Sequence, residues 1–300
     1  MPGSPKLSVV IASLVGPPFI DECLASVEAE ARELGAEVIV VASGTAEYAA
    51  RIRGKFPWAK LLHVAERATV PVLRRRGVEE ASGEIVAIVE EHCLAARDWL
   101  HQALRAHAGG DYVAVGGPIT DYGYRRLRDW VVYFVEYNGS LPPAPEGEVA
   151  FLNGANIAYR REVLMMHHAL LGRGYWEASL HPALLAANYR FLSVPEMVVS
   201  HRGPFNLVYY LKQRYWFSRA FAGARAKQMP ASQRLIYLVA APLLPAVLLA
   251  RIGMRVWQKH RRFDRFMLTL PLFVPALTAL VAGEWVGYAA GPGDALSKVE

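Results

Sequence analysis

The first third of the chain alternates short apolar runs with longer segments that have helical spacing. The apolar runs, rich in Val and Ile, cover residues 7–12, 37–42, 60–64, 84–89 and 112–115. Between them lie residues 20–34, 45–56, 70–81 and 98–108, each long enough for a helix. This alternation predicts an α/β fold with a mostly parallel sheet and right-handed crossovers. Because such sheets bind ligands at the carboxyl ends of their strands, we expect chemistry just after Ala12, Ala42 and Val89.

The segment that follows these elements has a different composition. Residues 116–150 are rich in Gly, Tyr and Pro, which predicts a loop or lid between two halves of one domain. Helical patterns return near residues 161–171 and 177–188, and short strands are expected near 191–194 and 197–200.

Charge is distributed unevenly along the chain. Residues 1–196 hold 19 basic and 23 acidic side chains, whereas residues 197–300 hold 14 basic and 4 acidic ones. A basic surface can indicate a nucleic-acid-binding protein. Here the basic residues stand beside long apolar runs, so we expect anionic lipid head groups as the partner and no nucleic acid.

The C-terminal region has the composition of membrane-associated helices. Residues 205–229 interleave aromatic and basic side chains, which predicts a basic amphipathic helix at a membrane surface or, alternatively, a surface helix packed on the core. Two uncharged runs follow, residues 235–250 with Pro242 and Pro245, and residues 266–283 with Pro271 and Pro275. A spanning helix needs about 20 residues, so the first run is marginal and the second is adequate.

The segment between the two runs conflicts with a simple double crossing. Residues 251–265 carry six basic side chains and one acidic one, a composition typical of the cytoplasmic side. The first twenty residues lack the pattern of a signal peptide, and the two cysteines predict no disulfide framework, so we expect the globular part in the cytoplasm too. The globular part and residues 251–265 can both lie in the cytoplasm if residues 235–250 form a kinked, re-entrant or in-plane arm that does not cross the membrane. Gly283, Gly287 and Gly291 share a helix face, which predicts either a close-packing seam or plain tail glycines.

These patterns divide the chain into three regions. We expect a catalytic α/β domain over residues 1–204, basic interfacial helices over 205–232, and a membrane-associated helical hairpin or tail over 233–300.

Acidic residues follow the strand predicted at 84–89. Glu90, Glu91 and His92 come directly after it, followed by Asp98 and Trp99. Carboxylates at a strand end that faces a sheet crevice suit a divalent cation that bridges two phosphates. Charged residues directly after a strand are also common in proteins that bind no cation there.

Six segments together resemble the family-2 glycosyltransferases of the GT-A fold, which are inverting nucleotide-sugar transferases. The resemblance covers roughly residues 7–230. The segments are residues 7–13, residues 38–45, Arg74–Gly77 with residues 81–84, residues 152–162, residues 176–181 and residues 198–201.

The resemblance implies a role for individual residues. It implies nucleotide-sugar binding by Ala12, Ser13, Ser43, Arg74, Glu90, Glu91, Asn153, Gly154 and Asn156. It implies a divalent cation, Mn²⁺ or Mg²⁺, held by Glu90, His92 and His201. Glu177 falls in the family's acidic base motif, which implies a general base for the acceptor hydroxyl; alternatively, it is a helix-start carboxylate stabilised by the helix dipole.

The chain departs from the family pattern at two positions. The family's Asp-x-Asp falls on Glu90-x-His92, and because His is a poor ligand for Mg²⁺ the metal dependence is open. The second-strand Asp that the family uses near the base is Ala42, so a UDP-sugar is only the default donor.

The sequence thus predicts an inverting glycosyltransferase on the cytoplasmic face of the cell membrane, with a lipid-linked or envelope-glycan acceptor. Two alternatives stay open. One is a polyprenyl-phosphate sugar transferase, whose phosphate acceptor needs no base. The other is a non-catalytic, glycosyltransferase-like scaffold subunit of an envelope complex.

Overall fold

The computed structural model describes residues 5–172, 174–203, 206–227 and 229–299. It divides into two compact units. Unit 1 comprises residues 1–122 and 140–202, and unit 2 comprises residues 123–139 and 203–300. The division after residue 202 lies close to the predicted boundary at 204, but residues 123–139 belong with the C-terminal unit.

Unit 1 is built on an eight-stranded sheet. Its strand order is β3-β2-β1-β4-β9-β6-β10-β8. The strands are β1 (Leu7–Ser13), β2 (Glu37–Ser43), β3 (Lys60–Val64), β4 (Ile85–Val89), β6 (Ala114–Gly116), β8 (Gly147–Val149), β9 (Asn156–Arg160) and β10 (Phe191–Ser193). The first four are mutually parallel, while β9 runs antiparallel between β4 and β6. The mostly parallel α/β sheet predicted from the sequence is therefore confirmed.

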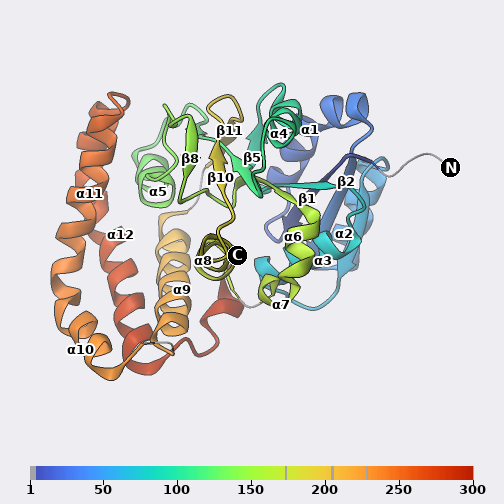
Figure 1. Cartoon of the computed structure of the whole chain (residues 1–300). Helices are drawn as coiled ribbons and strands as arrows, with labels where there is room; N and C mark the ends of the chain where they lie inside the picture. Colours follow the sequence, from blue (N-terminus) through green and yellow to red (C-terminus); the bar gives the residue numbers. More distant parts are fainter. Residues whose placement is uncertain (1–4, 173, 204–205, 228, 300) are drawn as a thin grey trace. The chain divides into compact units, whose positions relative to one another are not determined.

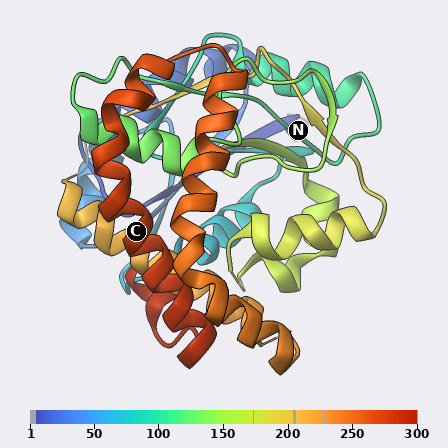
Figure 2. The same ribbon diagram turned by 90° about the vertical axis from the view of Figure 1, so that its left-hand side faces the viewer.

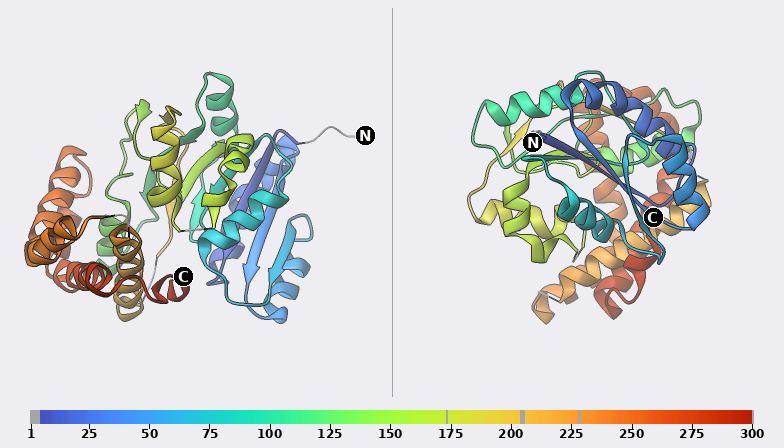
Figure 3. Two further views of the ribbon diagram at one scale, coloured as in Figure 1. Left: turned by 60° about the horizontal axis from the view of Figure 1, so that its bottom comes forward. Right: turned by 90° about the vertical axis from the view of Figure 1, so that its right-hand side faces the viewer.

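Helices cover both faces of this sheet. They are α1 (Phe19–Leu34), α2 (Ala46–Lys55), α3 (Val70–Glu80), α4 (Trp99–Ala108), α6 (Arg161–Met166), α7 (His168–Leu171) and α8 (Trp176–Ala186). Figure 1 shows α1 and α4 on one side of the strands and α3 and α6 on the other, and the right-hand view of Figure 3 shows the same two layers nearly end-on. Every residue of β1 and β4 is buried, which is why their sequences are continuously apolar rather than alternating.

Local sequence signals set the ends of these helices. Gly35 follows α1 in the left-handed conformation, with φ of 59°, and closes the helix with backbone hydrogen bonds. The Thr45 side chain caps α2 by accepting a hydrogen bond from the Tyr48 N–H. Gly77 lets α3 approach the sheet closely, because a Cβ at this position would collide with the Val10 side chain.

A second, three-stranded sheet extends unit 1. Its order is β5-β11-β7, with strands β5 (Cys93–Ala95), β7 (Ile119–Asp121) and β11 (Val199–His201). In this sheet His201 pairs with Cys93 on one side and with Asp121 on the other. The pairing brings the end of β11 next to the segment that follows β4.

Unit 2 is entirely helical. It comprises α5 (Leu127–Tyr137), α9 (Leu207–Ala226), α10 (Ala231–Ala240), the 3-10 turn η1 (Ala241–Leu243), α11 (Leu244–Gln258), α12 (Phe263–Ala290) and the 3-10 turn η2 (Ala295–Lys298). Figure 2 shows α11 and α12 running side by side as a hairpin.

The prediction of a continuous loop over residues 116–150 is wrong, because the segment contains α5 and two short strands. Most of α5 is buried, and Phe134 packs against Phe266 of α12 with ring centroids 5.8 Å apart. Arg128, Asp129 and Glu136 lie on one face of this helix, and its Val and aromatic residues lie mainly on the other. This one-sided pattern is typical of a helix, but the Gly- and Pro-rich residues around it favoured a loop. The apolar residues of α5 pack against α12.

The segment predicted as an interfacial helix forms α9, which packs on other helices of unit 2. Phe205 and Gln228, which belong to that predicted segment, lie outside the described residues. α9 packs along α12, and its buried face includes Tyr210 and Arg214, which both bond the Glu136 carboxylate of α5. One face of α9 therefore packs within unit 2, and the contact of its exposed face with a membrane stays a prediction.

The predicted glycine seam is confirmed for two of its three members. A Cβ on Gly287 would lie 2.6 Å from the Arg219 carbonyl oxygen of α9, and one on Gly283 would collide with the Tyr215 carbonyl oxygen. Gly291 instead ends α12 with φ of 80° and has open space around it. Two glycines thus let the backbones of α9 and α12 approach each other closely.

The hairpin has the length and composition of membrane helices. Residues 231–258 and 263–290 each form a helical stretch of 28 residues that could cross a membrane by these criteria. The first stretch is interrupted by η1 at Pro242, as its prolines predict. Only 11% of the most apolar 18 residues of this stretch are buried. Large apolar side chains therefore face outward, including Leu235, Ile236, Val239, Leu243 and Val247.

Candidate active site

The carboxyl end of β1 leads into a loop that Glu91 organises. One Glu91 oxygen accepts hydrogen bonds from the Leu14 and Val15 N–H groups at 2.7 and 2.8 Å. The other accepts from the Ser13 hydroxyl at 2.6 Å and the Gly16 N–H at 3.1 Å. Glu91 is only 3% exposed, so its buried carboxylate fixes the conformation of the β1–α1 loop from the inner side. The predicted direct contact of Glu91 with the nucleotide sugar does not agree with this burial.

Ser13 and Ser43 lie at neighbouring strand ends, as predicted, and Tyr48 connects the two loops there. The Tyr48 hydroxyl lies 2.5 Å from the Ser13 oxygen, and its ring packs against Gly16 and Gly44. Ser43 accepts a hydrogen bond from the Ala68 N–H and donates one to the Glu66 carbonyl, which fixes the chain after β3. Ala12 precedes Ser13 at the end of β1 and is nearly buried. The sequence analysis missed Tyr48, although its position one turn after the Gly44–Thr45 strand exit is a usable signal.

Four predicted residues converge beyond the end of β4. The buried Arg74 guanidinium of α3 forms an ion pair with Glu90 at 3.2 Å. The Gly154 N–H donates to one oxygen of Glu177 at 2.8 Å. A Cβ on Gly154 would lie 2.5 Å from that Glu177 oxygen and 2.8 Å from an Arg74 nitrogen. Residues that are up to 103 positions apart in the chain therefore share one cluster, and a side chain at position 154 would have to displace the Glu177 carboxylate or the Arg74 guanidinium.

Glu177 has one carboxylate oxygen without a hydrogen-bond partner among the described residues. It lies in the first turn of α8, where the helix dipole favours a carboxylate, so the helix-start explanation accounts for its position. That explanation does not account for the second oxygen, which is buried and unbonded. Burying a carboxylate oxygen without a hydrogen bond costs free energy, unless a ligand donates a hydrogen bond to that oxygen. Glu177 therefore has the free acceptor that a general base needs.

Asn153 and Asn156 flank Gly154 with different roles. Asn153 is half-buried, and its side chain accepts a hydrogen bond from the Ala155 N–H, which holds the turn. Asn156 is fully buried; its amide donates to the Pro118 and Met197 carbonyls and accepts from the Trp99 indole. Asn156 joins three segments of unit 1 and has no exposed atom for a ligand, so we assign it a structural role in place of the predicted contact.

His92 and His201 face each other where the two sheets of unit 1 meet. Their ring centroids are 6.4 Å apart, and the Arg202 N–H donates to the His92 carbonyl at 2.8 Å. Burial, together with the neighbouring His92, lowers the pKa of His201 to about 3. His201 is therefore neutral at physiological pH, the form in which an imidazole binds a metal.

The three predicted metal ligands are not assembled as a set. Within the described residues, one group of three side chains has its ligand atoms within 4.8 Å of one another, and this group is Glu30, Asp98 and His101. Glu90 is instead engaged by Arg74. Two imidazoles remain, a donor set that suits Mn²⁺ better than Mg²⁺. Such a pair fits a cation that takes its other ligands from the diphosphate of a substrate.

The sequence matches one family model over more than half of its length. The family described as glycosyl transferase family 2 matches residues 8–166, which include β1 to β9 and the segment with Glu90, Glu91 and His92. No curated protein matches the chain significantly in sequence.

Solved structures share the fold at low sequence identity. A mannosyltransferase from Pyrobaculum calidifontis, solved with GDP-Man and Mn²⁺, has a TM-score of 0.60 at 19% identity, and the match covers 96% of this chain and 88% of that one. The TarS protein of S. aureus, residues 1–349, has a TM-score of 0.50 at 14% identity, with 98% and 90% covered. GalNAc-T7, solved with UDP, GalNAc and Mn²⁺, has a TM-score of 0.51 at 15% identity, with 67% and 44% covered. The predicted GT-A-like fold is confirmed.

Proposed function

The chain belongs to glycosyl transferase family 2, and from that premise we propose that it is a membrane-associated, inverting glycosyltransferase. It is a nucleotide-sugar glycosyltransferase with a GT-A-like fold. In our proposal it moves the sugar to a lipid-linked or envelope-glycan acceptor at the cytoplasmic face of the membrane. One observation carries the proposal: Glu177 keeps a buried, unbonded oxygen within the cluster that Gly154, Arg74 and Glu90 complete.

The cluster supports a single-displacement reaction. Glu177 accepts the proton of the acceptor hydroxyl as that oxygen forms its bond to the anomeric carbon. The bond between the anomeric carbon and the nucleoside diphosphate breaks on the opposite side, which inverts the configuration. Arg74 is buried and ion-paired, so it holds Glu90 in place and contributes positive charge near the departing diphosphate.

His92 and His201 would hold the divalent cation, while Glu90 is held by Arg74. When bound, the cation supplies positive charge that offsets the charge developing on the diphosphate. The donor set favours Mn²⁺, and two similar structures contain this ion. We therefore expect Mn²⁺ to support higher activity than Mg²⁺, and EDTA to abolish donor turnover until Mn²⁺ is restored.

Membrane association rests on the outward-facing apolar side chains of residues 231–258. This surface would hold the enzyme where lipid-linked acceptors are found. Basic residues between the two helical stretches are consistent with a cytoplasmic location of that segment.

The proposal is tested by a donor screen on full-length protein in detergent with added lipid extract. We expect one nucleotide sugar to release its nucleoside diphosphate in the presence of Mn²⁺, and NMR of the product to show inversion at the anomeric carbon. GDP-Man and the UDP-sugars are screened first, since the similar structures contain GDP-Man or UDP. Retention of configuration would contradict the mechanism, and turnover that is independent of any acceptor would contradict the acceptor assignment.

A further inference from the structure

Unit 2 contains a cavity of about 220 Å³ that no part of the glycosyltransferase mechanism uses. It lies among α5, α11 and α12. Its lining consists of Val135, Asn138, Leu248, Arg251, Ile252, Arg255, Leu277 and Leu280. A water molecule occupies about 30 Å³ in the liquid, so the cavity has room for a small polyatomic group.

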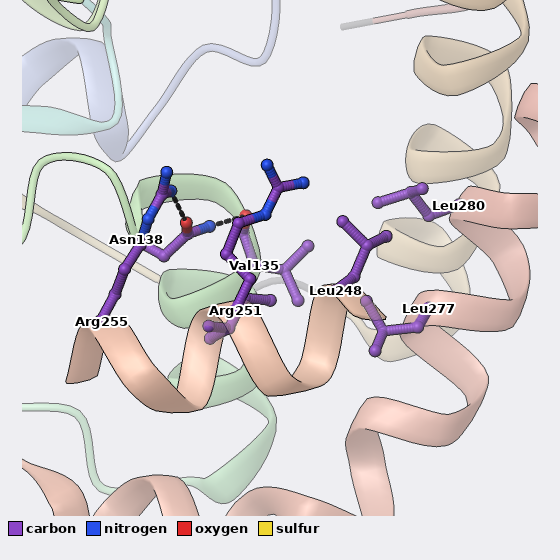
Figure 4. A pocket seen from close by; sticks show the side chains of 8 residues that line it. Val135, Asn138, Leu248, Arg251, Arg255, Leu277 and Leu280 are labelled. Atoms are coloured by element: carbon purple, nitrogen blue, oxygen red, sulfur yellow. Dashed lines mark hydrogen bonds between the residues drawn. The ribbon is translucent and has the colours of Figure 1, made fainter. Parts of the chain in front are cut away.

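The lining combines an apolar floor with a cationic edge. Figure 4 shows both guanidinium groups rising from α11 on the same side, with Leu277 and Leu280 contributed by α12. Arg255 donates a hydrogen bond to the Asn138 side-chain oxygen, and Asn138 in turn donates to the Val135 carbonyl at 3.0 Å. Asn138 is neutral, so this network orients Arg255 without cancelling its charge.

The positive charge of this edge is not neutralised by an ion pair among the described residues. Arg251 and Arg255 stand one helical turn apart, a spacing at which like charges repel. Within the described residues neither arginine forms an ion pair, and Glu284 of α12 interacts with Arg251 only through space while also interacting with Arg214 and Arg225. An anion placed between the two guanidinium groups would relieve their repulsion and accept charge-assisted hydrogen bonds from both.

We propose that this cavity binds the phosphate head group of an anionic phospholipid. The apolar floor and the outward apolar side chains of the same hairpin favour a phosphate attached to acyl chains over a free anion. The inference rests on the membrane association proposed above but not on sugar transfer. It assigns Arg251 and Arg255 a lipid-binding role that is separate from the acceptor site of unit 1.

The test measures binding of short-chain lipids to full-length protein in detergent. The probes are dihexanoyl phosphatidylglycerol, dihexanoyl phosphatidylcholine and inorganic phosphate, and calorimetry gives each Kd. We expect phosphatidylglycerol to bind at least tenfold more tightly than the other two probes. The Arg251→Gln/Arg255→Gln variant should lose this preference. Arg251→Gln alone should raise the Kd severalfold, and because Arg251 is exposed this variant leaves the packing intact.

A matched variant controls for general charge. Lys212→Gln/Arg261→Gln removes two exposed positive charges of unit 2 outside the cavity and should leave the Kd unchanged. An equal loss in this control, or equal binding of phosphatidylcholine or of inorganic phosphate, would overturn the proposal. Flotation of the wild type with vesicles separates the two hypotheses: a protein that floats but does not prefer phosphatidylglycerol refutes only the lipid site. A protein that binds phosphatidylglycerol but does not float refutes only membrane association.

Discussion

Glu177 differs from an ordinary helix-start carboxylate in its surroundings. One of its oxygens is fixed by the Gly154 N–H, and the other is buried and unbonded among the described residues. Glu177→Gln keeps the shape and the hydrogen-bond acceptor but cannot take a proton. We expect turnover to fall by about 10²–10⁴-fold while the Kd of the donor changes little. Stopped-time assays of sugar transfer and calorimetric titration of the nucleoside diphosphate measure the two quantities.

The control for Glu177 is a carboxylate in the same helical position. Glu47 lies in the first turn of α2 and is exposed, so Glu47→Gln removes a comparable interaction with a helix dipole. Its turnover should match that of the wild type. If Glu177→Gln retains full turnover with a lipid phosphate acceptor, the polyprenyl-phosphate alternative is favoured, because an ionised phosphate needs no base.

His107 makes stability depend on pH. Its two ring nitrogens lie 3.2 and 3.3 Å from the Tyr112 and Ala158 carbonyls, which raise its pKa, but burial outweighs them and lowers the pKa to about 4. Below pH 6.5 the unfolded chain binds a proton that the folded protein excludes, so the free energy of unfolding falls as pH falls from 6.5 to about 4. Over this range the slope due to one such histidine is about 1.4 kcal/mol per pH unit.

The His107→Gln variant isolates that effect. Gln has amide donors for the same carbonyls and does not titrate, so the slope of unfolding free energy between pH 4.5 and 6 should decrease by about 1.4 kcal/mol per pH unit. His181 and His201 also have lowered pKa values through burial and contribute equally to both proteins. Urea unfolding at several pH values provides the measurement, and parallel curves for the two proteins would refute this role of His107.

At the residue scale, sequence predicted the site's location better than the role of each side chain. Glu90, Gly154 and Glu177 do share one cluster with Arg74. Glu91 and Asn156 were expected to touch the ligand, but their partners lie 38 to 78 positions away in the chain. Whether a polar residue at a strand end faces solvent or supports a neighbouring loop depends on that tertiary packing, which no local pattern records.

At the scale of helices, the α9–α12 contact depends on two glycines. A Gly→Ala change in an open helix position stabilises by up to about 1 kcal/mol through propensity. At Gly283 and Gly287 the added Cβ would meet backbone atoms of α9, and overpacking costs about 1–3 kcal/mol. Because the steric cost exceeds the gain in propensity, we expect Gly283→Ala and Gly287→Ala each to lower the Tm measured in detergent.

The matched control for the seam is Gly54→Ala. Gly54 lies within α2, and a Cβ there meets nothing within 4 Å. The propensity gain then acts alone, so the Tm should stay the same or rise. A seam variant that behaves like Gly54→Ala would show that α9 and α12 do not pack closely in solution.

Most elements with a one-sided or continuous apolar pattern were predicted, and α5 is the exception. Strands β1 to β4 and helices α1 to α4 lie within two residues of the predicted ranges, because buried parallel strands and amphipathic helices carry local signals. The interruption of the helix at Pro242 was also predictable. α5 was missed because the Gly- and Pro-rich residues around it favoured a loop, although its own pattern is one-sided. The packing of α9 was not predictable, because the partner that buries its Arg214, Glu136, is 78 positions away in the chain.

At the scale of the whole molecule, the chain enters unit 2 twice. It leaves unit 1 after residue 122, forms α5, and returns at residue 140, before entering unit 2 again after residue 202. The unit 1 residues on either side of the inserted segment 123–139 are close together, since the Ile119 N–H donates to the Ser140 carbonyl at 2.9 Å. A catalytic domain cut simply at residue 202 would therefore keep α5 but lose α12, its packing partner.

This topology predicts the behaviour of a truncated protein. A fragment of residues 1–202 would expose the apolar side chains of α5, among them Trp130, Val131 and Phe134, which are buried in the full chain. Exposed apolar patches of this kind cause association, so we expect the fragment to elute as aggregates and to bind a hydrophobic dye. Replacing residues 124–138 by a short Gly-Ser linker should restore a monomer, because the unit 1 residues on either side of the inserted segment are close together. A fragment that is monomeric with α5 intact would show that α5 needs no partner from residues 203–300.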